Sequence, residues 1–414
     1  MSQYLDGRRL SRVRLGDLVR TRPGNSKLIK GKLPAAPCEG LFAAYSASGQ
    51  DVFAPQYEYD GNAVVISAVG ARCGKCFLAA GKWTGIANTH ALLPDETRIT
   101  AKFLWYQVND ERFWVRGGSA QPFVRVKDSL EKLIYAPDLA AQHNIVAEIE
   151  KQFSRLDEAV ANLQRVKANL KRYKGAVLQS VTSGQLETDG QASRECGEPQ
   201  GWRRLTIEEL ASREPRSVQS GPFGSNLLHS EFQASGKLVI GIDNVQDGAY
   251  SIGANHRISE SKFADLEKYR ARPQDVLITV MATVGRVCVL PEGIEPAIIT
   301  KHVYRITVDR AVALPEYVGI ALRGARDVRA QLLGSVQGQT RPGLNGTLIK
   351  RIRVPIPPLA EQHRIVAEVD RRLSIVREVE AEVDANLKRA QALRQSTLSA
   401  AFAMRGPRET MKAL

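Results

Sequence analysis

The segment SAVGARCGKCFL at positions 67–78 holds the residues best suited to chemistry in this chain. Its glycines and Lys75 resemble a phosphate-binding loop, while Cys73 and Cys76 have the spacing of half a zinc site or of a redox pair. A phosphate-binding loop needs four residues between its glycines and a hydroxyl after the lysine, but here three residues intervene and Cys76 follows. Zinc needs four ligands, and no second pair stands at a matching spacing. Strands flanked by turns do not indicate a thioredoxin-like redox setting. We therefore expect the two cysteines to be incidental to a strand-turn-strand unit, with no metal site.

Length and composition predict a packed protein of several domains. The 414 residues, 43% hydrophobic and 25% charged, favour two to four domains. Because no run approaches the roughly 20 apolar residues of a membrane helix, we expect no membrane association. The N-terminus lacks the apolar core of a signal peptide, so we expect a cytoplasmic protein. The five cysteines are an odd number, which favours free thiols in a reducing compartment.

The positive charge is concentrated in two blocks. The net charge is +14, with 19 basic against 12 acidic residues at 1–135 and 21 against 15 at 201–355. Residues 136–200 are nearly neutral, with 8 basic and 9 acidic residues. Such a chain attracts polyanions, and the dispersed Lys and Arg indicate folded basic surfaces rather than basic tails.

Two segments repeat each other closely. Residues 136–150 recur at 356–370, an offset of 220, with nine identities in 15 positions. Each copy leads into an apolar stripe with alternating spacings of three and four, which predicts long helices at 138–183 and 358–405. The simplest arrangement is an antiparallel pair within the chain, and pairing of each helix with another molecule is the alternative.

The two basic blocks repeat more faintly. Residues 63–67 align with 275–279 and residues 86–90 with 298–302, both at an offset of 212, and residues 118–122 align with 338–342 at an offset of 220. Short β-branched runs bounded by turn residues predict mixed, strand-rich domains. The expected fold is α+β, with a first domain at 1–137, a linker at 184–200, a second domain at 201–357 and a tail at 406–414.

The repeated signature carries a family resemblance. PPLAEQHRIVAEVD at 357–370, together with the second block at 201–226 and 275–279, resembles the specificity (S) subunits of type I restriction-modification systems. The resemblance implies a non-catalytic reader of double-stranded DNA with an internal pseudo-twofold repeat. Its two target recognition domains would be separated by two long helices that form an antiparallel coiled coil.

The resemblance also implies partners and cofactors. Two adenine methyltransferase subunits would bind the helices and use S-adenosylmethionine, and a restriction subunit would use ATP and Mg²⁺. No cofactor is expected on this chain itself. Two different readers on one frame predict a bipartite, asymmetric target whose spacer length the helices set.

Loop residues of both blocks are the candidate DNA contacts. Aligning Gly74-Lys75 with Gly285-Arg286 places Lys75 and Arg286 on matching turns, and Gln suits adenine while Arg suits guanine in the major groove. For each residue the alternative is an ordinary structural or solvated role. The candidate contacts are Lys75, His90, Ser119, Gln121, Ser220, Phe223, Ser225, Asn226, Arg286, Lys301, His302, Gln339 and Arg341.

The helical signature supplies a second set of candidates. Because the resemblance places the methyltransferase subunits on the helices, polar residues of the repeated motif are expected to touch them. These partner contacts are Gln142, His143, Glu361, Gln362, His363 and Arg364.

Motifs for catalysis are missing from the sequence. It contains no Asn/Asp-Pro-Pro-aromatic methyltransferase motif, no Gly-rich cofactor loop and no helicase Walker pair. Two other hypotheses stay open at this point. One is a coiled-coil scaffold whose basic domains bind DNA without sequence preference, and the other is an autonomous nucleotide-using enzyme built on residues 67–78.

Overall fold

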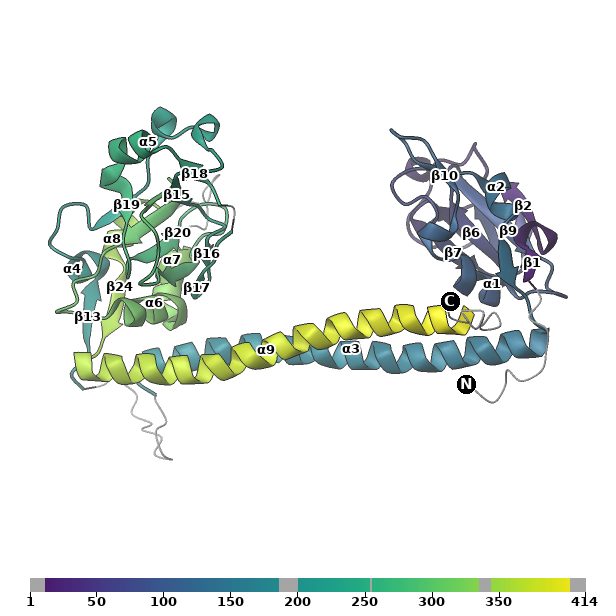
Figure 1. Ribbon diagram of the computed structural model, residues 1–414. Coiled ribbons are helices and arrows are strands. Elements are labelled where there is room, and N and C mark those ends of the chain that lie inside the picture. The colour runs from purple at the N-terminus through teal and green to yellow at the C-terminus, as the bar shows by residue number, and fades with distance from the viewer. Residues whose placement is uncertain (1–11, 186–199, 254, 335–343, 403–414) are drawn as a thin grey trace, which may run out of the picture. The chain divides into compact units, whose positions relative to one another are not determined.

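Two α+β domains with the same sheet order make up most of the chain (Figure 1). The computed structural model describes residues 12–185, 200–253, 255–334 and 344–402. The chain divides into two compact units, one of residues 1–163 and 385–414 and one of residues 164–384. Each unit contains one domain and part of both long helices.

In the first domain, an antiparallel sheet has the order β2-β9-β6-β7 and a second sheet has the order β4-β3-β8-β5. Within the second sheet, β3 and β8 run parallel. A ribbon pairs β1 with β12, and a hairpin pairs β10 with β11. The strands are β1 (Arg12–Arg14), β2 (Val19–Pro23), β3 (Phe42–Ser46), β4 (Gly49–Ala54), β5 (Tyr59–Asp60), β6 (Ala63–Ser67), β7 (Cys76–Ala79), β8 (Lys82–Gly85), β9 (Thr89–Pro94), β10 (Arg116–Gly117), β11 (Phe123–Val124) and β12 (Leu133–Tyr135).

The second domain repeats this topology, with sheets β14-β23-β20-β21 and β18-β15-β22-β19 and a ribbon of β13 and β24. Here β15 and β22 are the parallel pair. The domain also has an additional hairpin, β16 with β17. The strands are β13 (Arg203–Thr206), β14 (Val218–Ser220), β15 (Lys237–Ile240), β16 (Val245–Gln246), β17 (Ala249–Tyr250), β18 (Arg257–Ile258), β19 (Arg270–Ala271), β20 (Val276–Thr279), β21 (Val287–Val289), β22 (Ala297–Ile299), β23 (Val303–Ile306) and β24 (Arg353–Ile356).

The central strands β6 and β20 explain the unbroken apolar runs of the sequence. Every residue of both strands is buried. Val64 and Ile66 point into the core beneath helix α1, whereas Val65 points into the core shared with the second sheet. A strand covered on both faces needs apolar residues at consecutive positions, so the usual alternation disappears.

Short helices cover the sheets of each domain. Helix α1 begins after Thr100, whose hydroxyl accepts a hydrogen bond from Phe103 N at 3.3 Å. The short helices are α1 (Ala101–Val108), α2 (Val126–Leu130), α4 (Ile207–Leu210), α5 (Glu260–Asp265), α6 (Pro315–Gly324), α7 (Arg326–Gly334) and α8 (Gly346–Arg351). Single 3-10 turns are η2 (Leu15–Asp17), η3 (Lys30–Lys32), η4 (Glu111–Phe113), η5 (Gly224–Asn226), η6 (His229–Glu231) and η7 (Glu267–Tyr269).

The two predicted long helices are present as α3 (Leu139–Thr182) and α9 (Leu359–Phe402), each of 44 residues. They pack antiparallel within each unit. In the unit of the second domain, Lys174 bonds Glu380 at 2.5 Å and Lys167 bonds Asp384 at 2.7 Å. In the unit of the first domain, Asp157 bonds Arg394 at 2.5 Å. None of the helices that the structure describes combines the length and apolarity needed to cross a membrane.

Candidate nucleic-acid interface

The predicted DNA contacts of the first domain meet at one edge of its β2-β9-β6-β7 sheet. At this edge, which we call the first loop edge, residues 24–27 follow β2, residues 68–75 connect β6 to β7, and residues 86–88 precede β9. The hairpin loop 118–122 joins them, because Gly70 N donates to Pro122 O at 2.8 Å.

The second domain has an equivalent second loop edge, made of residues 221–226, 280–286 and 300–302. Leu344 N donates to Val280 O at 3.2 Å, just as Val124 N donates to Ala68 O at 2.9 Å in the first domain. The repeat offset of 220 therefore holds at these two residues. Gln339 and Arg341 themselves lie outside the described residues.

The two tight turns close onto their preceding strands through the same main-chain hydrogen bond. Gly74 N donates to Ser67 O and Gly285 N donates to Thr279 O, both at 2.8 Å. Their φ angles of +95° and +82° lie in the region that glycine tolerates best. This geometry confirms the predicted equivalence of Lys75 and Arg286, each of which follows such a glycine.

Histidines 90 and 302 are not equivalent, contrary to the sequence alignment. His90 pairs with Ile66 in the sheet, and the residue that pairs with the matching Ile278 is Tyr304. His302 instead precedes its strand, where its Nδ1 lies 3.2 Å from Met281 Sδ. Burial lowers the pKa of both histidines, so the neutral forms are favoured.

The reason for this misalignment is that the connections between strands differ in length. Six residues separate Ser67 from Gly74, but five separate Thr279 from Gly285. The connection from β21 to β22 has seven residues, 290–296, whereas that from β7 to β8 has two, 80–81. Loops absorb such changes at little energetic cost, so one offset does not hold from strand to strand.

The remaining predicted contacts differ in exposure. Ser220 is 8% exposed and paired with Tyr304 inside the sheet, so its prediction as a DNA contact is not supported by its position. Phe223 is 56% exposed, and its carbonyl accepts a hydrogen bond from Asn226 Nδ2 at 2.9 Å. The other predicted residues with exposed positions at the loop edges are Lys75, Ser119, Gln121, Ser225, Asn226 and Lys301.

Sequence reasoning missed the first-domain counterpart of the 221–226 loop. A Cβ at Gly24 would lie 2.1 Å from Ile86 O, and one at Gly221 would lie 2.0 Å from Ile299 O, so both chains pass equally close to a neighbouring strand. The polar residues Asn25 and Lys27 follow Gly24 and belong to the first loop edge. A glycine directly after β2 and after β14 was the sequence signal that could have revealed this equivalence.

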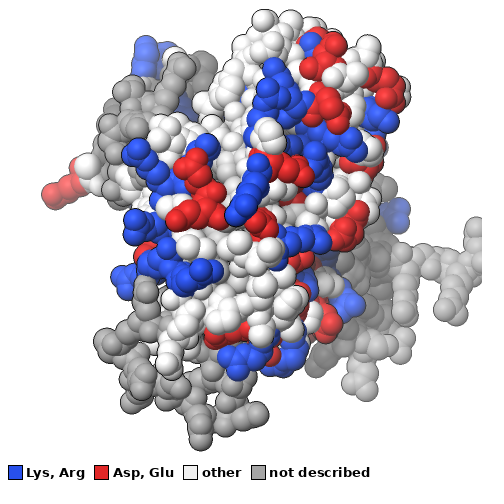
Figure 2. Space-filling model, turned by 90° about the vertical axis from the view of Figure 1, so that its left-hand side faces the viewer, with Lys and Arg blue, Asp and Glu red and all other residues white. Residues whose placement is uncertain are grey.

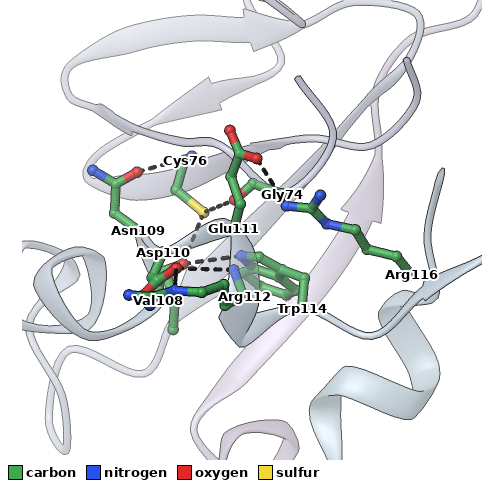
Figure 3. Close-up of polar contacts among 9 residues, drawn as sticks. All are labelled: Gly74, Cys76, Val108, Asn109, Asp110, Glu111, Arg112, Trp114 and Arg116. Atoms are coloured by element: carbon green, nitrogen blue, oxygen red, sulfur yellow. Dashed lines mark hydrogen bonds and ion pairs between the residues drawn. The ribbon is translucent and has the colours of Figure 1, made fainter. Parts of the chain in front are cut away.

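The cysteines of the first turn have a structural role. Cys73 and Cys76 are free thiols, each at most 2% exposed. Cys76 Sγ contacts Val108 O at 3.4 Å and Gly74 O at 3.6 Å (Figure 3). Burial raises the pKa of the Cys76 thiol, which keeps it protonated and unreactive. Within the described ranges, no three His, Cys, Asp or Glu side chains come together as a metal site.

One buried glutamine on each long helix links that helix to its own domain. Gln142 accepts from Thr100 N at 2.9 Å and donates to Arg98 O and Pro137 O, both at 2.8 Å. Gln362 accepts from Leu314 N at 2.8 Å and donates to Val312 O and Pro357 O at 3.3 and 2.9 Å. Both side chains are 0% exposed. We therefore correct their prediction as partner contacts, because neither reaches the surface.

The other predicted partner contacts lie at or near the surface of the helices. His143, His363 and Arg364 are exposed. Glu361 is half-buried and accepts a hydrogen bond from Trp202 Nε1 at 3.0 Å. That bond attaches the second domain to α9.

Charges of both signs cover the face of the second domain that carries α4 and β13. In Figure 2, Lys and Arg side chains alternate there with Asp and Glu. Several of these pairs are bonded, such as Arg204 with Asp327 and Lys350 with Glu208. The described residues of this face therefore do not form the basic surface that the sequence predicts.

A comparison with family models finds a match in the second half of the chain. Residues 227–385 match the family model of the type I restriction modification DNA specificity domain. The second domain with its adjoining helix is therefore similar to a type I specificity domain. The predicted resemblance to type I specificity subunits is thereby confirmed.

Similar proteins share this description. The EcoBI specificity subunit of Escherichia coli is 25% identical over 278 residues, 66% of this chain and 58% of that protein. This chain thus spans 58% of the length of that relative. The MjaVIII specificity subunit of Methanocaldococcus jannaschii is 21% identical over 411 residues, 92% of this chain and 91% of that protein.

Solved structures share the fold of the whole chain. One, from work on complex assembly and conformational transition of the type I system, has a TM-score of 0.67 at 18% identity and covers 96% of this chain and 99% of its own. The HsdS subunit from Thermoanaerobacter tengcongensis has a TM-score of 0.50 at 18% identity, with coverage of 97% and 99%. The fold of specificity subunits, two domains with two long helices, is confirmed.

Proposed function

We propose that this chain reads the DNA sequence for a type I restriction-modification complex and catalyses no reaction itself. The observation that carries the proposal is the duplicated loop edge. Two domains of one topology bring their turns and exposed polar side chains to the same edge of the sheet. Base reading needs side chains on a fixed framework, and the shared main-chain bonds of the two turns supply that framework.

The target is proposed to be bipartite and asymmetric. The frameworks match, but the side chains on them differ, as Lys75 and Arg286 do on equivalent turns. Each domain therefore reads its own half of the target. The long helices set the spacer, so inserting seven residues into both helices at paired positions lengthens each by about 10 Å and should lengthen the spacer by about three base pairs.

Methyltransferase subunits are the proposed partners of the helices. In the unit of the second domain, a groove between α3 and α9 is lined by Tyr173, Ile375 and Val379, which are 47%, 52% and 39% exposed. Exposed apolar side chains at this density support a protein partner. The methyltransferase subunit would flip adenine and use S-adenosylmethionine, and a restriction subunit would use ATP and Mg²⁺. The complex would act in the cytoplasm.

Mapping methylated adenines in single DNA molecules tests the proposal. Cells that carry this chain and its neighbouring methyltransferase should show one bipartite motif with a methylated adenine in each half. The motif should vanish when only this chain is deleted. A motif that survives the deletion would refute the proposal, and an affinity equal for all duplexes and set only by salt would favour a non-specific scaffold.

A further inference from the structure

We propose that Arg286 reads a guanine in the half-target of the second domain and that Gln246 positions it. The inference rests on the proposed function and adds to it the identity of one base pair and the residue that reads it. It assigns different tasks to the two equivalent turns, since Lys75 lies at the matching position of the first domain.

Arg286 is held from two sides. Its main-chain N donates to Thr279 Oγ1 at 3.0 Å, which fixes the turn beneath it. Its Nη1 donates to Gln246 Oε1 at 3.2 Å, and Gln246 Nε2 in turn donates to Asp243 O at 2.9 Å. A guanidinium has five N–H donors, so the edge formed by Nε and Nη2 keeps its hydrogen-bonding capacity.

Gln246 owes its place to the hairpin of β16 and β17 rather than to Arg286. The hairpin is tied to β21 by Gly248 N, which donates to Val287 O at 2.7 Å. It is tied to α6 by Asp247, whose carboxylate lies 3.3 Å from Arg323 Nε. Because both ties are independent of Arg286, the glutamine is the fixed partner and orients the arginine.

No equivalent of this hairpin occurs among residues 12–137 of the first domain. Only Ala47 and Ser48 stand between β3 and β4, whereas residues 241–256, including the hairpin, stand between the equivalent strands β15 and β18. At the first turn, the Lys75 side chain has a ring contact as its one interaction among the described residues, with its Nζ 5.9 Å from the centre of Phe77. A long flexible cation without a positioning partner suits a phosphate rather than a base edge.

A neutral partner matters for reading guanine. Guanine presents two acceptors, N7 and O6, in the major groove, and a guanidinium matches both at once. Gln246 orients Arg286 without cancelling its charge. In the first domain, by contrast, Arg116 beside Gly74 is paired with the Glu111 carboxylate at 2.9 Å (Figure 3). Glu111 compensates that charge, so Arg116 supports the turn and Arg286 is the better base reader.

The test maps the methylated motif of the whole complex with variants of this chain. Arg286→Ala and the milder Arg286→Lys should each relax one G·C position in a single half of the motif. Discrimination there should fall on the order of 10- to 100-fold. Gln246→Ala should relax the same position by a smaller factor. The matched control is Arg310→Ala, which removes an exposed arginine paired with Glu292 beyond the far end of β23 and should leave the motif unchanged.

Several outcomes would overturn the assignment. If Arg286→Lys keeps base discrimination at every position of the motif, Arg286 is not a base reader. If the variant weakens methylation equally for all sequences, Arg286 contacts a phosphate instead. If the Arg286 and Gln246 variants relax base discrimination in different halves of the motif, Gln246 does not position Arg286. In each of these cases the wild-type motif stays bipartite, so the proposed function stands. Only a wild-type complex without a bipartite motif refutes that function.

Discussion

The two loop edges share their main-chain bonds and differ in their side chains. In both domains a glycine with positive φ closes the turn onto the preceding strand, and a second glycine passes close to the neighbouring strand. Both domains also attach their helix through a buried glutamine. Main-chain and buried contacts are insensitive to what the surface carries, so the framework can stay constant while the surface diverges. Recognition is thereby separated from folding.

The largest loss of stability is expected at the buried glutamines, where the two domains are most alike. Gln142→Ala and Gln362→Ala each remove three hydrogen bonds and leave buried main-chain groups unsatisfied. We expect each to lower the free energy of unfolding by about 3 kcal/mol, measured by urea denaturation. His363→Ala, an exposed neighbour on the same helix, is the control and should change it by less than about 0.5 kcal/mol. A large loss at one glutamine only would break the equivalence.

Glycines 24 and 221 test the framework beside the loops. A Cβ at either position would lie within 2.1 Å of a carbonyl oxygen, so alanine forces the strands apart. We expect Gly24→Ala and Gly221→Ala each to cost about 2 kcal/mol of stability in thermal or urea unfolding. Gly31→Ala and Gly293→Ala are matched controls, because nothing lies within 4 Å of the added Cβ. Equal stability of test and control variants would contradict the packing described.

A smaller, pH-dependent effect should distinguish the two helices. Hydrogen bonds from Arg371, joined by Arg372, lower the pKa of Glu368 to about 2. Its counterpart Glu148 has a lowered pKa mainly through the neutral Gln152. A depressed carboxyl pKa stabilises the fold above the unfolded value of 4.5, and this stabilisation is lost as pH falls towards about 2.

The two variants Glu368→Gln and Glu148→Gln measure this difference. Comparing urea midpoints between pH 2 and pH 6, we expect Glu368→Gln to flatten the acid limb more than Glu148→Gln. Arg372→Gln, which makes the second site resemble the first, should lie between the wild type and Glu368→Gln. A larger change in acid stability for Glu148→Gln than for Glu368→Gln would contradict this, because the neutral Gln152 would then stabilise its carboxylate more than the arginines do.

Much of this architecture could be predicted from the sequence. The helices were accessible because the repeated motif and the apolar stripe mark them independently. The turn of Lys75 and Arg286 was accessible because glycine is needed where φ is positive. The equivalence of His90 and His302 failed because loops of unequal length shift the offset between strands.

Side-chain burial was the part that the sequence concealed. Gln142 and Gln362 are polar residues on a helix, and a pattern cannot distinguish an exposed amide from one buried against strand ends. Gln142 bonds Thr100 and Gln362 bonds Leu314, and each of these partners lies more than 40 residues away in the sequence. The hairpin that positions Arg286 was hidden for the same reason, since its contacts join segments distant in sequence.

The central claim is that each domain reads one half of the target on a shared framework. Exchanging residues 1–135 for the first domain of another specificity subunit, and then mapping methylated adenines, tests it most directly. The account predicts that one half of the motif changes while the other half and the spacer stay the same. A motif that changes in both halves, or in neither, would contradict it.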